Sequence, residues 1–166
     1  MREDGPVFFA TIGVYGFDGP GFLAALRDAD IGLILDVRQR RGVRGADYSW
    51  ANAKRLQAAL AEAGIGYAHL PELAPTTELR QLQYVEDARL GEGKRSRTRL
   101  APEYARRYTE EILDAVDLAP ILRFVGSQRA ALLCVERDPE ACHRSLIAAR
   151  LERELGVGVS HLLPDR

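Results

Sequence analysis

The chain has 166 residues, of which 46% are hydrophobic and 28% are charged, and its formal net charge is −1. These values are typical of one globular domain that buries roughly two-thirds of its unfolded surface, and the small net charge gives no general attraction to polyanions. Two cysteines are too few for a disulfide scaffold, no apolar run approaches the roughly 20 residues of a membrane span, and the N-terminus MREDGPVFFA lacks a signal-peptide pattern, so we expect a cytoplasmic protein.

Strand-like and helix-like segments alternate along the chain. Apolar, β-rich segments predict strands at 7–15, 31–38, 66–73, 130–136 and 158–163, and helical patterns lie between them at 22–30, 51–64, from Glu103 onwards and at 140–155. Helical crossovers imply parallel pairing, so we predict an α/β fold: a three-layer, Rossmann-like or flavodoxin-like sandwich with a mainly parallel sheet of about five strands. One domain covers 1–166, and 75–102 is predicted to be an irregular excursion over the sheet, part helical and part mobile.

Polar residues stand at the predicted carboxyl ends of four strands, where open parallel sheets bind their ligands. They are Thr11 and Gly13 after the first strand, Asp36 and Arg38 on the second, His69 and Glu72 on the third, and Glu136 on the fourth. The sequence therefore predicts a charged cleft at this edge. Asp36, His69 and Glu136 are its candidate acids or bases, and the others are its candidate ligand contacts.

The segment ERDPEACHRS (136–145) is predicted to begin the last helix, with Asp138 as the N-cap residue and Pro139 in the first helical position. Arg144 lies on the stripe that faces the sheet and therefore needs an acceptor. Two interpretations are open: an ion pair with Asp36 or Glu136, or an anion held by the guanidinium group and the helix N-terminus.

Two neighbours of Arg144 are further candidates. Cys142 falls in the first helical turn, where the thiol pKa is lowered, so it is a candidate nucleophile. On an ideal helix of about 100° per residue, however, Cys142 points away from the sheet, which favours an incidental thiol. His143 lies at the border of the buried face and is predicted to contact the ligand.

Standard metal and nucleotide signatures are absent from the sequence. It has no CxxC or HxxxH pattern, Cys134 lies inside a predicted strand, and adjacent helical residues rarely reach one ion, so no metal site is predicted. GVYGFDGPG does not match GxGxxG, and GxxxxGK[ST] does not occur, so no cofactor is predicted.

Two arginine-rich runs, RQRRGVRG and GKRSRTR, suggest an alternative partner. With nearby aromatic residues that stack on bases, they would form a noncatalytic nucleic-acid-binding module. Its residues are Arg40, Arg41, Arg44, Trp50, Lys94, Arg95, Arg97 and Arg99. The competing interpretation is a pair of solvated loops balanced by acidic helices.

Four motifs carry a resemblance to a known family: TIG (11–13), DVR (36–38), HLPEL (69–73) and LLCVERDPEACHRSLIA (132–148). Over roughly residues 8–162 the chain resembles a bacterial family of uncharacterised proteins, domain-of-unknown-function family 488. The resemblance implies an α/β fold and no established activity. Members often have a histidine after TIG, where this chain has Val14.

The sequence thus predicts a protein that binds an anionic, phosphate- or carboxylate-bearing molecule at the strand ends. Enzymatic activity is left open, with hydrolysis or group transfer as the reaction type. The alternatives are the nucleic-acid-binding module and a scaffold whose polar edge is purely structural. No membrane partner is expected, and the oligomeric state is left open.

Overall fold

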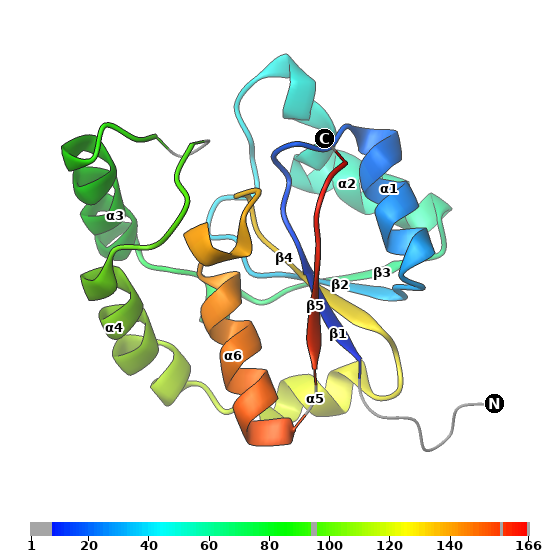
Figure 1. Ribbon diagram of the computed structural model, residues 1–166. Helices are drawn as coiled ribbons and strands as arrows, with labels where there is room; N and C mark the ends of the chain where they lie inside the picture. The colour runs from blue at the N-terminus through cyan, green and yellow to red at the C-terminus, as the bar shows by residue number, and fades with distance from the viewer. Residues whose placement is uncertain (1–7, 94–95, 157, 166) are drawn as a thin grey trace.

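The computed structural model describes residues 8–93, 96–156 and 158–165. Its sheet has five strands in the order β3-β2-β4-β1-β5, and every pairing in the described chain is parallel (Figure 1). The strands are β1 (Phe9–Ile12), β2 (Leu33–Asp36), β3 (Gly66–His69), β4 (Ala130–Leu133) and β5 (Val159–Leu162). Each is shorter than the apolar segment that predicted it, because the chains turn away from the sheet after four paired residues.

Helices cover both faces of the sheet, which confirms the predicted three-layer α/β fold (Figure 1). The α-helices are α1 (Gly19–Asp28), α2 (Ala53–Glu62), α3 (Thr77–Arg89), α4 (Pro102–Glu111), α5 (Ala119–Val125) and α6 (Arg144–Leu155). Short 3-10 helices occupy Ala46–Ala51 (η1), Pro71–Leu73 (η2), Leu113–Ala115 (η3) and Pro139–Ala141 (η4).

Two apolar clusters, one on each face, hold the layers together. Phe22 of α1 and Leu56 of α2 pack with Ile12 and Ile34 on one face. On the other face, the cluster joins residues of α4, α5 and α6 to alternate residues of the same strands: Tyr104, Tyr108, Val125, Ile147 and Leu151 with Leu33, Leu35 and Leu132. The alternation follows from the two-residue period of a strand and shows that both faces of the sheet are buried.

The segment 75–102 contains a helix of 13 residues, α3. Thr76 caps its start by accepting a hydrogen bond from the backbone N–H of Leu79. The buried residues of α3 are Leu79, Gln83 and Asp87, spaced by four. Since two of these three are polar, the buried stripe does not appear as hydrophobic periodicity in the sequence.

The last helix begins later than predicted. Pro139–Ala141 form the separate turn η4, Cys142 is extended with φ −138° and ψ 148°, and α6 starts at Arg144. The extended backbone turns the Cys142 side chain into the cluster around α4 and α6, so only 1% of the residue is exposed. The helical-wheel prediction that this thiol points away from the sheet was therefore wrong.

The carboxyl ends of the strands lie at one edge of the sheet, since Asp36 is in register with both His69 and Leu133. After β2 the chain continues to α2 on one face, whereas after β4 it continues to α6 on the other (Figure 1). Adjacent strand ends that diverge in this way leave a crevice between them. None of the helices in the described chain is both long and apolar enough to cross a membrane.

Candidate functional site

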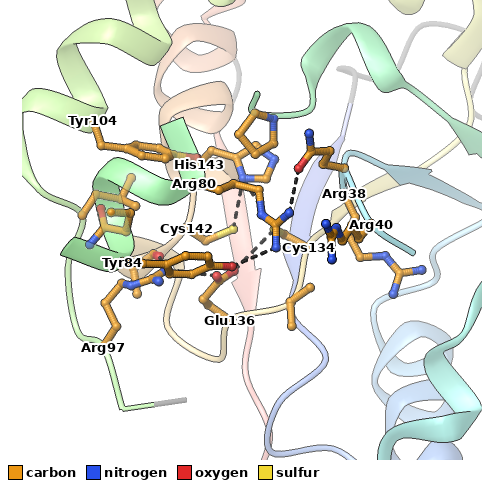
Figure 2. A pocket seen from close by; sticks show the side chains of 16 residues that line it. Arg38, Arg40, Arg80, Tyr84, Arg97, Tyr104, Cys134, Glu136, Cys142 and His143 are labelled. Atoms are coloured by element: carbon orange, nitrogen blue, oxygen red, sulfur yellow. Dashed lines mark hydrogen bonds and ion pairs between the residues drawn. The ribbon is translucent and has the colours of Figure 1, made fainter. Parts of the chain in front are cut away.

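A cavity of about 50 Å³ lies beyond the carboxyl ends of β2 and β4 (Figure 2). Four parts of the chain line it: the segments after β2 and β4, α3 with the residues just before it, and α4 with the segment that leads into it. The lining residues are Arg38, Gln39, Arg40, Pro75, Arg80, Gln83, Tyr84, Arg97, Leu100, Tyr104, Cys134, Val135, Glu136, Ala141, Cys142 and His143. A wider groove of about 660 Å³ shares Arg40, Arg80 and Tyr84 with the cavity.

Cys134, Cys142 and His143 form one wall of the cavity and are here called the thiol cluster. The Sγ atoms of Cys134 and Cys142 lie 3.5 Å and 3.7 Å from Nδ1 of His143. Nε2 of His143 lies 2.9 Å from the carbonyl oxygen of Val37. Because a carbonyl oxygen only accepts hydrogen bonds, Nε2 carries the proton, and Nδ1 faces the two sulfurs.

The two thiols differ in their ionisation. Burial raises the pKa of the Cys134 thiol well above its usual value. Burial also opposes ionisation of Cys142, but the hydrogen bond from Cys134 and the charges of His143 and Arg144 hold the pKa of Cys142 well below its usual value. Cys142 is thus the more acidic thiol of the pair, and Sγ of Cys134 also lies 3.5 Å from Oε2 of Glu136.

Arg97 links α3 to the strand ends through a buried ion-pair network. Its Nη2 donates to Oδ2 of Asp87 at 2.6 Å, and its Nη1 donates to Oε1 of Glu136 at 3.0 Å and to the carbonyl oxygen of Ala141 at 3.2 Å. Arg97 is 6% exposed, so its guanidinium group interacts with the carboxylates of Asp87 and Glu136 and not with solvent. The same network orients Glu136, a predicted acid or base, beside the thiol cluster.

Two arginines of the cavity have no carboxylate partner among the described residues. Arg80 donates to Oε1 of Gln39 and to the hydroxyl oxygen of Tyr84, both at 2.8 Å, and its guanidinium carbon lies 5.7 Å from the centre of the Tyr84 ring. Arg40 is exposed, and within the described chain it has no hydrogen bond or ion pair. The rim therefore carries positive charge that forms no ion pair with an acidic group among the described residues.

Asp36 and Arg38 satisfy each other. Nε and Nη2 of Arg38 each donate to the Asp36 carboxylate at 2.9 Å, and Nη1 donates to the carbonyl oxygen of Ala51 at 2.9 Å. The Tyr67 hydroxyl also donates to Asp36. Asp36 is fully buried and does not line the cavity, whereas Arg38 does. The Asp36 carboxylate therefore holds Arg38, and with it the segment after β2, in place.

Arg144 does not line the cavity, but it contacts the backbone of Glu136, which does. It donates to the hydroxyl of Thr11 at 3.1 Å and to the carbonyl oxygens of Glu136 and Arg137 at 2.6 Å and 3.1 Å. Neither carboxylate that was considered as its acceptor contacts it. Gly13 packs against the same carbonyl of Glu136, so Thr11, Gly13 and Arg144 together fix the loop that follows β4.

The remaining residues predicted for the cleft lie beside the cavity without lining it. Nε2 of His69 lies 3.0 Å from the backbone carbonyl oxygen of Arg38 and contacts it without lining the cavity. Glu72 is exposed in η2. Val14 is fully buried in the apolar cluster that includes α1 and α2. The side chain at this position therefore belongs to the core here.

The arginine-rich runs are only partly exposed, and their described residues meet at the groove, which Arg40 and Arg44 of one run and Ser96 of the other line. Arg38 and Arg97 are buried, Arg41 donates to the Tyr67 hydroxyl at 3.3 Å, and the ring of Trp50 packs against that of Phe22. Arg44 and Arg99 are exposed. Lys94 and Arg95 lie outside the described residues.

Sequence reasoning missed Arg80 and Gln83, which α3 contributes to the cavity together with Tyr84. Their spacing of three to four residues would have placed them on one face of a helix, had 77–89 been recognised as helical. Cys134 was also set aside as an ordinary strand residue. It is the first residue after β4, and its partner Cys142 is close only because η4 reverses the chain.

The model of the family described as domain of unknown function DUF488 matches residues 20–151. The chain belongs to this family. The DUF488 match covers β2 to β4 and most of α6, and therefore every residue that lines the cavity. No curated protein and no solved structure matches the chain.

Proposed function

We propose that this DUF488 protein binds a small anionic molecule in the cavity beyond β2 and β4 and acts on it by hydrolysis or group transfer. The observation that carries the proposal is the rim formed by Arg40 and Arg80, whose partners in the described chain are neutral or absent. Guanidinium groups bind carboxylates and phosphates through paired N–H donors, and a crevice with low-dielectric walls strengthens their field.

The size of the cavity limits what enters it. At roughly 10–15 Å³ for each water, its volume of about 50 Å³ accommodates about three to five waters, which is the size of one carboxylate or phosphate group. A larger body would occupy the groove that Arg40, Arg80 and Tyr84 share with the cavity. We therefore assign the charged, reacting group to the cavity and the remainder of the molecule to the groove.

The chemistry next to that group supports the reaction type. Hydrolysis and group transfer need a nucleophile and a proton-transfer group at the bound anion. Cys142, His143 and Glu136 all line the same small cavity, and Arg97 holds one oxygen of Glu136 in place. Three reactive side chains thus surround the space that the arginines make attractive to an anion.

Binding is tested with inorganic phosphate as the probe, titrated into the full chain while the Nε–H NMR signals of Arg40 and Arg80 are followed. We expect saturable shifts, and Arg80→Gln should weaken binding by about 10–100-fold, because a hydrogen bond to a charged group contributes about 1.5–3 kcal/mol. Arg123→Gln is the control, since Arg123 is exposed on α5 at the opposite end of the sheet.

Equal phosphate affinity in both variants, or shifts spread over the whole surface, would remove the proposed anion site. A parallel titration with a single-stranded oligonucleotide tests the nucleic-acid alternative. Binding that weakens steeply with salt would favour that alternative, because each neutralised phosphate releases counterions. Turnover of a simple phosphomonoester, lost in Arg80→Gln and kept in Arg123→Gln, would support the catalytic part of the proposal.

A further inference from the structure

The thiol cluster brings three metal-binding atoms together from separate parts of the chain. Cys134 follows β4, Cys142 lies in the extended link after η4, and His143 immediately precedes α6. Their donor atoms all lie within 4.8 Å of one another, and all three residues are buried. Both cysteines are free thiols.

The spacing matches that of a tetrahedral zinc site. With Zn–S of about 2.3 Å and Zn–N of about 2.0–2.1 Å, tetrahedral angles place a ligand nitrogen about 3.5 Å from a ligand sulfur. The two Sγ–Nδ1 distances are 3.5 Å and 3.7 Å. An ion therefore enters between these atoms with little movement of the side chains.

The imidazole is already oriented as a ligand. The hydrogen bond from Nε2 of His143 to the carbonyl oxygen of Val37 directs Nδ1 at the sulfurs, so that its lone pair faces them when the ring is neutral, as it is in a metal complex. Metal-bound histidines almost always donate their other ring N–H to such an acceptor. Val37 is fully buried next to β2, so this support is rigid.

We propose that Cys134, Cys142 and His143 bind one zinc ion whose fourth position opens into the cavity. Two thiolates and one imidazole select zinc over magnesium or calcium, which prefer oxygen ligands, and they leave the Zn²⁺ site electrically neutral. All three ligands line the cavity, so a water or an oxygen of a bound anion occupies the remaining position. Three protein ligands and one exchangeable position are the pattern of catalytic zinc sites.

The zinc site is argued from the thiol cluster alone and does not depend on the anion-binding arginines. With zinc bound, Cys142 and His143 would be ligands, and a zinc-bound water would supply the nucleophile in place of Cys142. The first test is the metal content of the full chain, purified under reducing conditions after growth with added zinc. We expect one zinc per chain, and after exchange with Co²⁺ we expect the visible bands of tetrahedral cobalt together with a sulfur-to-cobalt charge-transfer band in the near ultraviolet.

Three variants locate the ion. Cys134→Ser, Cys142→Ser and His143→Asn should each lower zinc affinity by more than the 10–100-fold that loss of an outer hydrogen-bond partner typically costs. His69→Asn is the matched control, because His69 lies at the same edge of the sheet but outside the cluster. It should retain one zinc per chain.

A measurement on the unaltered protein covers the case in which a variant fails to fold. Zinc should protect both thiols from alkylation, and removal of zinc by a chelator should restore their reaction. Substoichiometric zinc, a cobalt spectrum without sulfur ligation, or equal alkylation with and without zinc would overturn the proposal. The cluster would then be a hydrogen-bonded thiol–imidazole group with Cys142 as its free nucleophile.

One experiment distinguishes failure of the anion-binding proposal from failure of the zinc proposal. Phosphate is titrated into zinc-loaded and zinc-free protein. Zinc uptake without phosphate binding would overturn the anion proposal alone, and phosphate binding without zinc uptake would overturn the metal proposal alone.

Discussion

Gly13 shows how a single position determines the shape of the site. A Cβ atom added there would lie 1.9 Å from the carbonyl oxygen of Glu136 and 3.0 Å from Nη1 of Arg144. The same carbonyl accepts the Arg144 hydrogen bond at 2.6 Å. The glycine is therefore required for space, because the turn after β1 touches the backbone of the loop that carries Glu136.

Gly13→Ala should destabilise the protein by about 1–3 kcal/mol or more, since a methyl group forced into a filled core displaces backbone that cannot yield cheaply. Urea unfolding monitored by circular dichroism measures this change in the free energy of unfolding. Gly32→Ala is the control, because its Cβ would have as its nearest neighbour the carbonyl oxygen of Arg129 at 4.0 Å. Equal stability of the two variants would contradict the assigned role of Gly13.

At the residue scale, the sequence predicted that a buried polar side chain requires a hydrogen-bond partner, but not which group is that partner. It placed Arg144 on the buried stripe of a helix and required an acceptor for it, and the structure supplies two carbonyl oxygens and a hydroxyl. Carbonyl acceptors depend on the path of the backbone, which residue types do not reveal. The pairing of Asp36 with Arg38 was within reach of the sequence, since residues two apart on a strand share a face.

At the element scale, α3 depends on a polar interior. Gln83 donates to Asp87 at 2.9 Å and accepts from the backbone N–H of Ala101 at 2.8 Å, while Arg97 pairs with Asp87 and Glu136. These contacts tie α3 to the segment before α4 and to the end of β4. Hydrophobic periodicity could not predict this, because the buried face of α3 is held largely by hydrogen bonds and ion pairs.

Arg97→Met should loosen α3, because it leaves the Asp87 and Glu136 carboxylates buried without their common cation, at a cost of about 3–5 kcal/mol. Hydrogen exchange should accelerate at the α3 amides while those of β1 and β4 remain protected. Arg106→Met is the control: its ion pairs with Glu103 and Glu110 are on the surface of α4, and no change in α3 exchange is expected. Unchanged exchange in Arg97→Met would show that the network does not hold the helix.

At the scale of the whole molecule, the alternation of apolar strands and helices was sufficient to predict the three-layer α/β fold, and the rule for strand carboxyl ends indicated the edge of the sheet at which the cavity lies. The strand order was not predicted, because both faces of the three inner strands β1, β2 and β4 are buried and largely apolar, so their composition does not distinguish them. The thiol cluster was missed because its cysteines come from separate segments of the chain. Only the completed sheet and the turn η4 bring Cys134 and Cys142 together.

The core between the sheet and α4 makes global stability sensitive to alkaline pH. Burial raises the pKa of Tyr104 and of Tyr108 well above the usual value. Above about pH 10, the unfolded chain loses these phenolic protons while the folded chain retains them. The stabilisation is thus complete below pH 10 and is lost as the pH rises further, by up to about 1.4 kcal/mol per pH unit for each tyrosine.

Tyr108→Phe isolates one of these contributions. Near neutral pH the variant should be less stable than the unaltered protein by about 1 kcal/mol, since the Tyr108 hydroxyl donates to the carbonyl oxygen of Leu73 at 2.6 Å. Above about pH 10 the difference should shrink and then reverse, because the variant no longer has that phenol to ionise when it unfolds. Urea unfolding at a series of pH values gives both curves, and other titrating groups cancel in their difference. Parallel curves would show that Tyr108 does not contribute to the alkaline loss of stability.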